Sequence, residues 1–174
     1  MMKTLNKKVL SVLLCLCMVS AFTLSACGIE EQIARLVQGE NIGEVGKEYS
    51  TKWFTFTVDS MSTTQSIPEY SANEGNLLLV ATITQTNTSG ARQPFGTFDW
   101  FVDDTSLPDY LYPEELNSVN STMMPDEFWL SDGESATYTV VIEFPENLAS
   151  PFLVYIEVDE NEQTYATFKI PISS

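Results

Sequence analysis

The stretch Trp53-Phe54-Thr55-Phe56-Thr57-Val58 decides the fold class. From Phe54 onward its apolar residues alternate with threonines. This period of two is typical of a β-strand with one buried face, because successive side chains of a strand point to opposite sides. The same period returns in residues 76–86 and 135–144, so these segments also predict strands and not helices.

Further segments complete the predicted set of strands. Residues 95–102 are rich in aromatic side chains and are expected to be extended, and residues 152–158 and 164–170 flank an acidic stretch that is typical of a hairpin turn. No long amphipathic helix is indicated after residue 46, and the connections are rich in turn residues. We therefore expect an all-β fold, an immunoglobulin-like β-sandwich of about six to eight mostly antiparallel strands.

The composition restricts the function. The chain has 174 residues, of which 24 are acidic and 8 basic, and its formal net charge is -16. Nucleic acid is not an expected partner, because its phosphates are bound by clustered Lys and Arg. The chain contains no histidine, so a serine or cysteine nucleophile would lack its usual base. With 44% apolar residues it can still bury a core, and we expect a folded protein that is not an enzyme.

The N-terminal residues have the composition of an export signal. Three lysines precede an apolar run at residues 9–22, and no acidic residue occurs before Glu30. The run is shorter than the ~20 residues that a helix needs to cross a bilayer. A cleaved signal peptide is therefore expected, and not a transmembrane span.

The residues that follow, Leu24-Ser25-Ala26-Cys27-Gly28, resemble the bacterial lipobox, a small-residue cleavage site that ends in cysteine. The resemblance implies that Cys27 receives a thioether-linked diacylglycerol and becomes the mature N-terminus. The alternative is an ordinary secreted protein that is cut after Ala26. Because two or three acyl chains form a stable anchor, lipidation at Cys27 predicts a protein held at the extracytoplasmic face of the cell membrane.

The chain is expected to have three parts. Residues 1–26 would be the signal peptide, residues 27–46 the lipidated N-terminus and a tether, and residues 47–174 the sandwich domain. The aliphatic residues of the tether would also fit one face of a two-turn helix, but isolated helices below about 12 residues rarely persist in water. Cleavage after Ala26 would remove lysines and no acidic residue, so the exported protein would be more acidic than the full chain.

Three motifs carry a resemblance to a known family. Val45-Gly46-Lys47 stands before the first strand, Glu74-Gly75-Asn76 opens the second, and Leu130-Ser131-Asp132-Gly133-Glu134-Ser135 opens a later one. Together they resemble the immunoglobulin-like domain of unknown function found in many lipoproteins of Gram-positive bacteria, which is related in fold to a secreted mycobacterial immunogenic protein. The resemblance covers residues 43–170, but residues 95–130 are longer and more acidic than the family pattern. It implies export and a surface role, and it supplies no catalytic residues.

Residues 95–130 interleave carboxylates with aromatic rings. Ca²⁺ requires several convergent oxygen ligands, and Asp103, Asp104 and Asp109 are the best local trio. This trio would make the protein a divalent-cation-binding envelope sensor or buffer. The Asp-x-Asp-x-Asp-Gly loop is absent, however, and the alternative is that these are solvated acidic loops.

The aromatic residues of the same segment suggest a recognition surface formed by Trp100, Tyr110, Tyr112 and Trp129. Tyr and Trp are enriched at interfaces, because one end of each side chain is apolar and the other is polar. Such rings would receive a sugar or a partner protein. Trp100 shares a face of the predicted strand with Phe98, so a place in the core is the alternative for it. The leading hypothesis is a membrane-anchored, non-catalytic binding or interaction module that has no cofactor unless Ca²⁺ binds.

Overall fold

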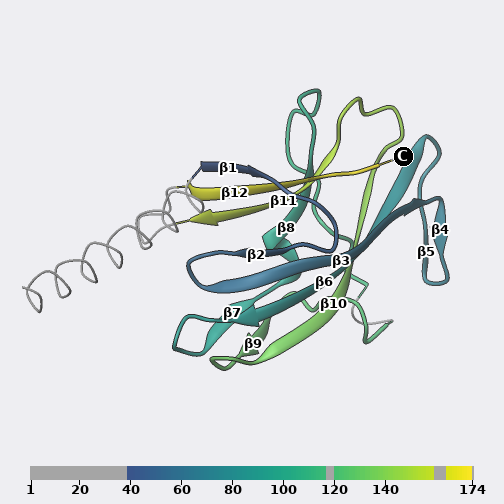
Figure 1. Ribbon diagram of the computed structural model, residues 1–174. Coiled ribbons are helices and arrows are strands. Elements are labelled where there is room, and N and C mark those ends of the chain that lie inside the picture. Colours follow the sequence, from purple (N-terminus) through teal and green to yellow (C-terminus); the bar gives the residue numbers. More distant parts are fainter. Residues whose placement is uncertain (1–38, 117–119, 159–163, 174) are drawn as a thin grey trace, which may run out of the picture. The chain divides into compact units, whose positions relative to one another are not determined.

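The computed structural model describes residues 39–116, 120–158 and 164–173 (Figure 1). The predicted signal peptide, Cys27 and most of the predicted tether lie outside the described residues. Residues 37–174 form one compact unit, which contains both main sheets and the core between them. Within the described part of the chain, no helix is long and apolar enough to span a membrane.

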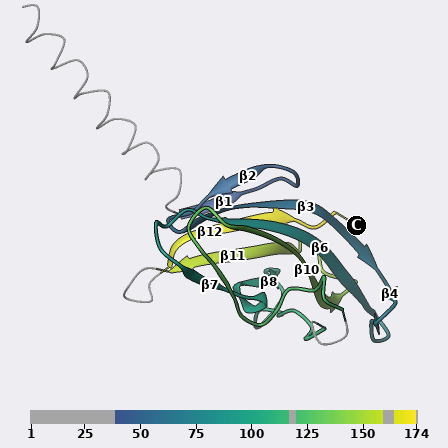
Figure 2. The same ribbon diagram turned by 90° about the horizontal axis from the view of Figure 1, so that it is seen from below.

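Two four-stranded sheets form the sandwich (Figure 1, Figure 2). In spatial order, sheet A consists of β1 (Gly39–Ile42), β12 (Thr164–Pro171), β11 (Phe152–Val158) and β8 (Trp100–Asp103). Sheet B consists of β10 (Ser135–Pro145), β6 (Asn76–Asn87), β3 (Phe54–Thr64) and β2 (Glu48–Ser50). Neighbouring strands are antiparallel except β1 and β12, which run parallel. The expected sandwich of mostly antiparallel strands is confirmed.

Shorter elements flank the two sheets. β4 (Ser66–Ile67) pairs with β5 (Tyr70–Ser71), and β7 (Gln93–Phe95) pairs with β9 (Phe128–Leu130). The prediction of one continuous strand at residues 95–102 is wrong, because the 3-10 helix η1 (Thr97–Asp99) separates β7 from β8.

A single carboxylate explains this interruption. Asp99 Oδ2 accepts a hydrogen bond from the backbone N–H of Gly96 at 2.9 Å and holds the turn in place. A side chain at position 96 would also collide with the backbone oxygen of Asp126, so the turn can form only around a glycine.

The sandwich begins inside the range that was predicted to be tether. β1 pairs with β12 over residues 39–42, and the N–H of Gly43 donates to the Lys169 oxygen at 2.8 Å. A Cβ at Gly43 would lie 2.9 Å from Ile170 Cγ1, so this close approach requires glycine. β1 is mostly exposed and its residues do not alternate between apolar and polar, which explains why its sequence does not indicate a strand.

The core between the sheets is rich in aromatic rings. Phe56 of β3 lies with its ring centroid 5.1 Å from Trp100 of β8 and 5.3 Å from Phe168 of β12. Tyr155 of β11 lies 5.5 Å from Trp100. The inward positions of the central strand of sheet B alternate as predicted and are Leu79, Ala81 and Ile83.

A second apolar cluster covers the outer face of sheet B. Leu78 of β6 and Val141 of β10 form it together with Met123, which comes from the connection between β8 and β9. Ile67 and Tyr70 of the β4–β5 pair pack against the same cluster. β6 is therefore buried on both faces near its start, which explains the continuous apolar run in its sequence.

Candidate functional site

The acidic trio predicted as a cation site does not form one. Asp104 is 3% exposed and its carboxylate is occupied: Oδ1 accepts from the Ser106 N–H at 2.8 Å and from Ser106 Oγ at 2.6 Å, and Oδ2 accepts from the Ser150 N–H at 2.8 Å. The hydrogen bonds from Ser106 hold the pKa of Asp104 below its usual value. Asp103 faces Lys169, with Oδ2 3.8 Å from Nζ, and Asp109 is exposed.

Across the described ranges, no group of three or more acidic, cysteine or histidine side chains is placed to hold a metal ion. The prediction of a Ca²⁺ site at Asp103, Asp104 and Asp109 is therefore wrong. The physical reason is that hydrogen bonds occupy both oxygens of Asp104: Ser106 of the same loop donates to Oδ1, and Ser150 of the β10–β11 connection donates to Oδ2.

Residues 110–112 lie along the free edge of β8. The Leu111 N–H donates to the Val102 oxygen at 3.0 Å, and the Val102 N–H donates to the Leu111 oxygen at 2.8 Å. Leu111 packs against the core, as Val102 does. Because side chains alternate along an extended chain, Tyr110 and Tyr112 point to the outer side of sheet A, the side to which Phe101 also points.

Four aromatic side chains therefore gather on the outer side of sheet A. We call Phe98, Phe101, Tyr110 and Tyr112 the aromatic surface. The ring centroid of Phe101 lies 4.2 Å from that of Tyr110 and 5.9 Å from that of Tyr112, which lies 6.4 Å from Phe98. Phe101 at the centre is only 5% exposed, whereas the exposed fractions of the other side chains are 47% for Phe98, 44% for Tyr110 and 50% for Tyr112. Two half-exposed rings thus contact a buried one, and the third half-exposed ring, Phe98, contacts Tyr112.

The tryptophans of the predicted recognition surface lie elsewhere. Trp100 is fully buried in the core, so its assignment to an exposed surface is wrong. Trp129 is 44% exposed, but its indole N–H donates to Glu127 Oε1 at 2.8 Å and the guanidinium of Arg92 lies 5.0 Å from its ring centroid. Among the described rings, none of the aromatic surface contacts Trp129.

Phe98 and Phe101 belong to the aromatic surface and are absent from the predicted set. The sequence does contain a signal that Phe98 lies in a turn and not in a strand. Asp99 stands three residues after Gly96, and an acidic residue at this position is typical of the start of a helical turn. This turn breaks the alternation that would place Phe98 on the same face as Trp100. The outward direction of Phe101 could be predicted from strand alternation, since its neighbour in the strand, Trp100, faces inward.

The surroundings of the aromatic surface are acidic. A hollow of about 190 Å³ adjoins it at Phe98, and its wall includes Asp99, Asp126 and Glu127. Burial raises the pKa of Asp99. No basic residue lines this hollow in the part of the chain that the structure describes.

Glu143 of β10 fastens the β4–β5 pair to sheet B. Its Oε2 accepts from the Tyr70 hydroxyl at 2.7 Å, and its Oε1 accepts from the Asn73 N–H, Asn73 Nδ2 and Asn76 Nδ2 at 2.8, 2.9 and 2.6 Å. The hydrogen bond from Asn76 and those from Tyr70 and Asn73 lower the pKa of Glu143 to about 2. The same contact with Glu143 raises the pKa of Tyr70 to about 12, and burial raises the pKa of the nearby Glu114. We call these contacts the Glu143 clasp.

A buried carboxylate holds the turn between β2 and β3. Glu157 of β11 is 1% exposed, and its Oε1 accepts from the Lys52 N–H at 2.7 Å. Its Oε2 has no hydrogen-bond partner among the described residues, as is also true of Trp100 Nε1 and both amide atoms of Gln85. Burial raises the pKa of Glu157. Glu157 therefore attaches this turn to sheet A.

Comparison with known proteins identifies the fold alone. No family model matches the chain, and no curated protein matches it. Among solved structures, the candidate lipoprotein ycdA of Bacillus subtilis is 16% identical, with a TM-score of 0.55 over 71% of this chain and 38% of that one. The secreted protein MPT63 of Mycobacterium tuberculosis is 10% identical, with a TM-score of 0.53 over 74% of this chain and 95% of that one. The chain shares their β-sandwich fold.

A functionally unknown protein from Listeria monocytogenes EGD-e is also similar, with 12% identity and a TM-score of 0.53 over 74% of this chain and 82% of that one. The chain spans less than half the length of ycdA. The relation in fold to a secreted mycobacterial protein, expected from the sequence, is confirmed.

Proposed function

We propose that this protein is lipid-anchored at the extracytoplasmic face of the cell membrane, and that its sandwich is a non-catalytic module that binds a partner protein through the aromatic surface. One observation carries the binding role: three half-exposed rings form one group on one side of sheet A, in which Tyr110 and Tyr112 contact Phe101 and Phe98 contacts Tyr112. The location is supported by the lipobox resemblance at Cys27 and by two fold neighbours, one described as a candidate lipoprotein and the other as secreted.

Exposed aromatic rings in contact with one another favour a binding role on energetic grounds. Each ring buries a large apolar area when a partner covers it, and Tyr loses little conformational entropy because it has few rotatable bonds. Contiguous exposed apolar patches on soluble domains commonly mark sites of interaction. Phe101 fixes the positions of Tyr110 and Tyr112 by direct ring contact, so part of the ordering cost is met before a partner binds.

The backbone beside these rings favours an extended segment of a protein as the partner. Leu111 directs its N–H and C=O toward β8, so Tyr110 and Tyr112 direct theirs to the opposite side, as alternation in an antiparallel pair requires. Among the described residues, none forms a hydrogen bond with these backbone groups. A free edge of this kind can pair with an added strand, while Pro113 limits its length.

Photo-crosslinking in intact cells tests the proposed site. A benzophenone amino acid is placed at Tyr112 and, as a matched control of similar exposure, at Trp129. We expect a discrete protein adduct from position 112 and none of that mass from position 129. Equal diffuse labelling at both positions, or an adduct with cell-wall glycan alone, would contradict a protein partner at the aromatic surface.

The anchor is tested separately. Cys27→Ala removes the sulfur that would carry the lipid, so we expect the protein either in the medium or uncleaved, whereas the unmodified chain stays with the membrane. Cys17→Ala, inside the apolar run of the signal, is the control and should be processed normally. Normal processing and membrane retention of the Cys27→Ala protein would contradict lipidation.

A further inference from the structure

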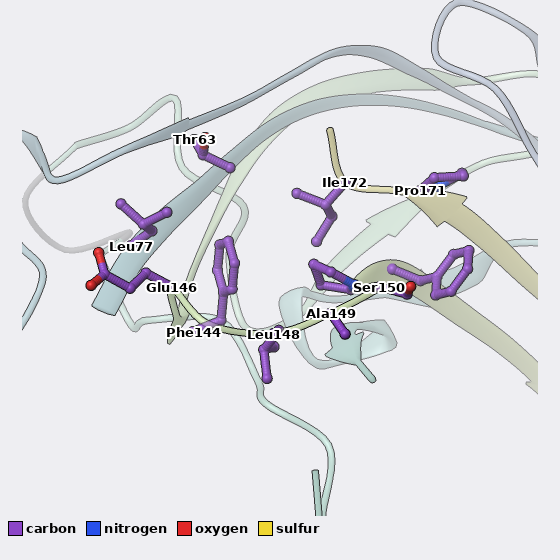
Figure 3. A pocket seen from close by; sticks show the side chains of 11 residues that line it. Thr63, Leu77, Phe144, Glu146, Leu148, Ala149, Ser150, Pro171 and Ile172 are labelled. Carbon is purple, nitrogen blue, oxygen red and sulfur yellow. The ribbon is translucent and has the colours of Figure 1, made fainter. Parts of the chain in front are cut away.

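A cavity of about 310 Å³ opens at one end of the sandwich, where β10 ends and β11 begins; we call it the end cavity (Figure 3). Phe144 of β10 and Ile172 after β12 form part of its lining and are also members of the core, with 4% and 9% exposure. Figure 3 shows Leu77 and Glu146 on one side of Phe144 and Ile172 on the other. The end cavity therefore borders the hydrophobic core at this end of the sandwich.

The strand ends account for this opening. Pro145 ends β10, Pro171 ends β12 and Pro151 precedes β11, and a proline cannot donate to the hydrogen-bond ladder of a sheet. The N–H of Ile172 donates to the Pro151 oxygen at 3.0 Å and holds the end of the chain beside the connecting loop. Leu148 of this loop lines the cavity, so apolar side chains from separate segments meet there.

In the lining that the described residues form, Glu146 is the one ionisable member, and it is exposed. Glu146 also lines a second, polar hollow of about 440 Å³, to which Glu74 and several neutral polar residues contribute. Two of those neutral residues, Asn73 and Asn76, are held in place by the Glu143 clasp. In the described part of the chain, no side chain forms a hydrogen bond or ion pair with the carboxylate of Glu146 or Glu74.

The end cavity, with Phe144, Leu148 and Ile172 in its lining, thus shares Glu146 with the polar hollow, which Glu74 also lines. From this geometry we infer that the end cavity binds an amphipathic cation, with its apolar group among Phe144, Leu148 and Ile172 and its ammonium group at Glu146 and Glu74. The volume lies at the lower end of the range for small-molecule sites, roughly 300–1,000 Å³. Among the residues that the structure describes, no basic one lines the end cavity or the polar hollow, and the net charge of -16 attracts cations and repels anions.

This site is separate from the aromatic surface, so its test does not depend on the proposed partner. Residues 37–174, which hold both sheets and the core, are titrated with hexylammonium, hexan-1-ol and hexanoate, three probes with the same apolar chain and different charge. The methyl signals of Leu148 and Ile172 are followed by NMR. We expect both signals to shift, with affinity highest for hexylammonium and lowest for hexanoate. Equal affinity for the three probes would contradict the cation, and no shift with any of them would contradict the cavity as a ligand site.

Two variants assign the two parts of the site. Glu146→Gln should weaken hexylammonium about two- to fivefold, the range for an exposed ion pair, and should leave hexan-1-ol unchanged. Glu48→Gln is the matched control, because Glu48 lies away from the cavity. Glu48 pairs with Thr57 in the first half of β3, whereas Thr63, which lines the cavity, lies near the end of that strand. Ala149→Phe should fill the cavity and abolish binding of hexylammonium and hexan-1-ol while the thermal unfolding curve confirms folding. Unchanged binding in both Glu146→Gln and Ala149→Phe would overturn the assignment.

Discussion

The outer faces of the two sheets differ, although one connecting segment contributes to both. On sheet B, Met123 and the β4–β5 pair cover Leu78, and the Glu143 clasp fastens this cover. On sheet A, Tyr110 and Tyr112 of the same segment lie half exposed around Phe101. The chain therefore buries one set of outward apolar residues and leaves another in solvent. This contrast supports the proposal that the cover of sheet B stabilises the fold and that the rings of sheet A bind a partner.

The largest effect should come from opening the cover of sheet B. Leu78→Ala removes a fully buried side chain and should lower the free energy of unfolding by about 2–5 kcal/mol. Chemical denaturation of residues 37–174 measures it. Val158→Ala in sheet A is the control, because Val158 is 48% exposed, and it should change stability by less than about 0.5 kcal/mol. Equal small losses in both variants would show that the outer cluster is not a packed core.

Loosening the Glu143 clasp should have a smaller effect. Glu143→Gln keeps the shape but replaces an acceptor-only carboxylate with an amide, so one or more of the donors on Tyr70, Asn73 and Asn76 lose their partner. We expect a loss of about 1–3 kcal/mol in the free energy of unfolding. Glu48→Gln, an exposed carboxylate in the same sheet, is the reference, and a loss no greater than in this variant would contradict the clasp.

The clasp also predicts a dependence on pH. The pKa of Glu143 is lowered to about 2 from an ordinary value of 4.5, so its contribution to stability is complete above pH 4.5 and is lost as the pH falls toward 2. Unfolding curves recorded through this window should show a steeper loss in the unmodified protein than in Glu143→Gln. Parallel losses in the two proteins would mean that other carboxylates cause the acid sensitivity.

The smallest change in stability is expected on the outer face of sheet A. Tyr110→Ser combined with Tyr112→Ser removes two half-exposed rings and should lower the free energy of unfolding by less than about 1 kcal/mol. Denaturation of the double variant beside Leu78→Ala measures the contrast directly. A loss as large as that of Leu78→Ala would show that these rings hold the fold together and would remove the distinction between the two faces.

Alternation along β3, β6 and β10 could be predicted from the sequence, because the period of two is a property of the extended backbone itself. The burial of Trp100 and the exposure of Phe98 could not be predicted. The N–H of Gly96 donates to Asp99 within the turn at η1, and this turn breaks the alternation that would place both rings on one face. The role of Asp104 could not be predicted either, because its carboxylate accepts hydrogen bonds both from Ser106 in its own loop and from Ser150 in the distant β10–β11 connection.

Two of the four rings of the aromatic surface can be predicted from the sequence, whereas the end cavity cannot. Tyr110 and Tyr112 stand out because they are aromatic and lie in an acidic loop, but their contact with Phe101 depends on the pairing of Leu111 with Val102. The lining of the end cavity comes from β3, β6, the end of β10, the β10–β11 connection, the start of β11, the end of β12 and Ile172 after it. Side chains from segments so far apart meet only in the folded protein.

The most direct test of the contrast between the two faces is a photo-crosslinking comparison in intact cells. A benzophenone amino acid is introduced at Tyr112 beside sheet A or at Ser121, an exposed position two residues before Met123 of the cover of sheet B. We predict one discrete protein adduct from position 112, lost when Tyr110 is also changed to Ser, and no adduct of that mass from position 121. The same adduct from both positions, or one from position 121 alone, would contradict the claim that the aromatic surface is the binding face.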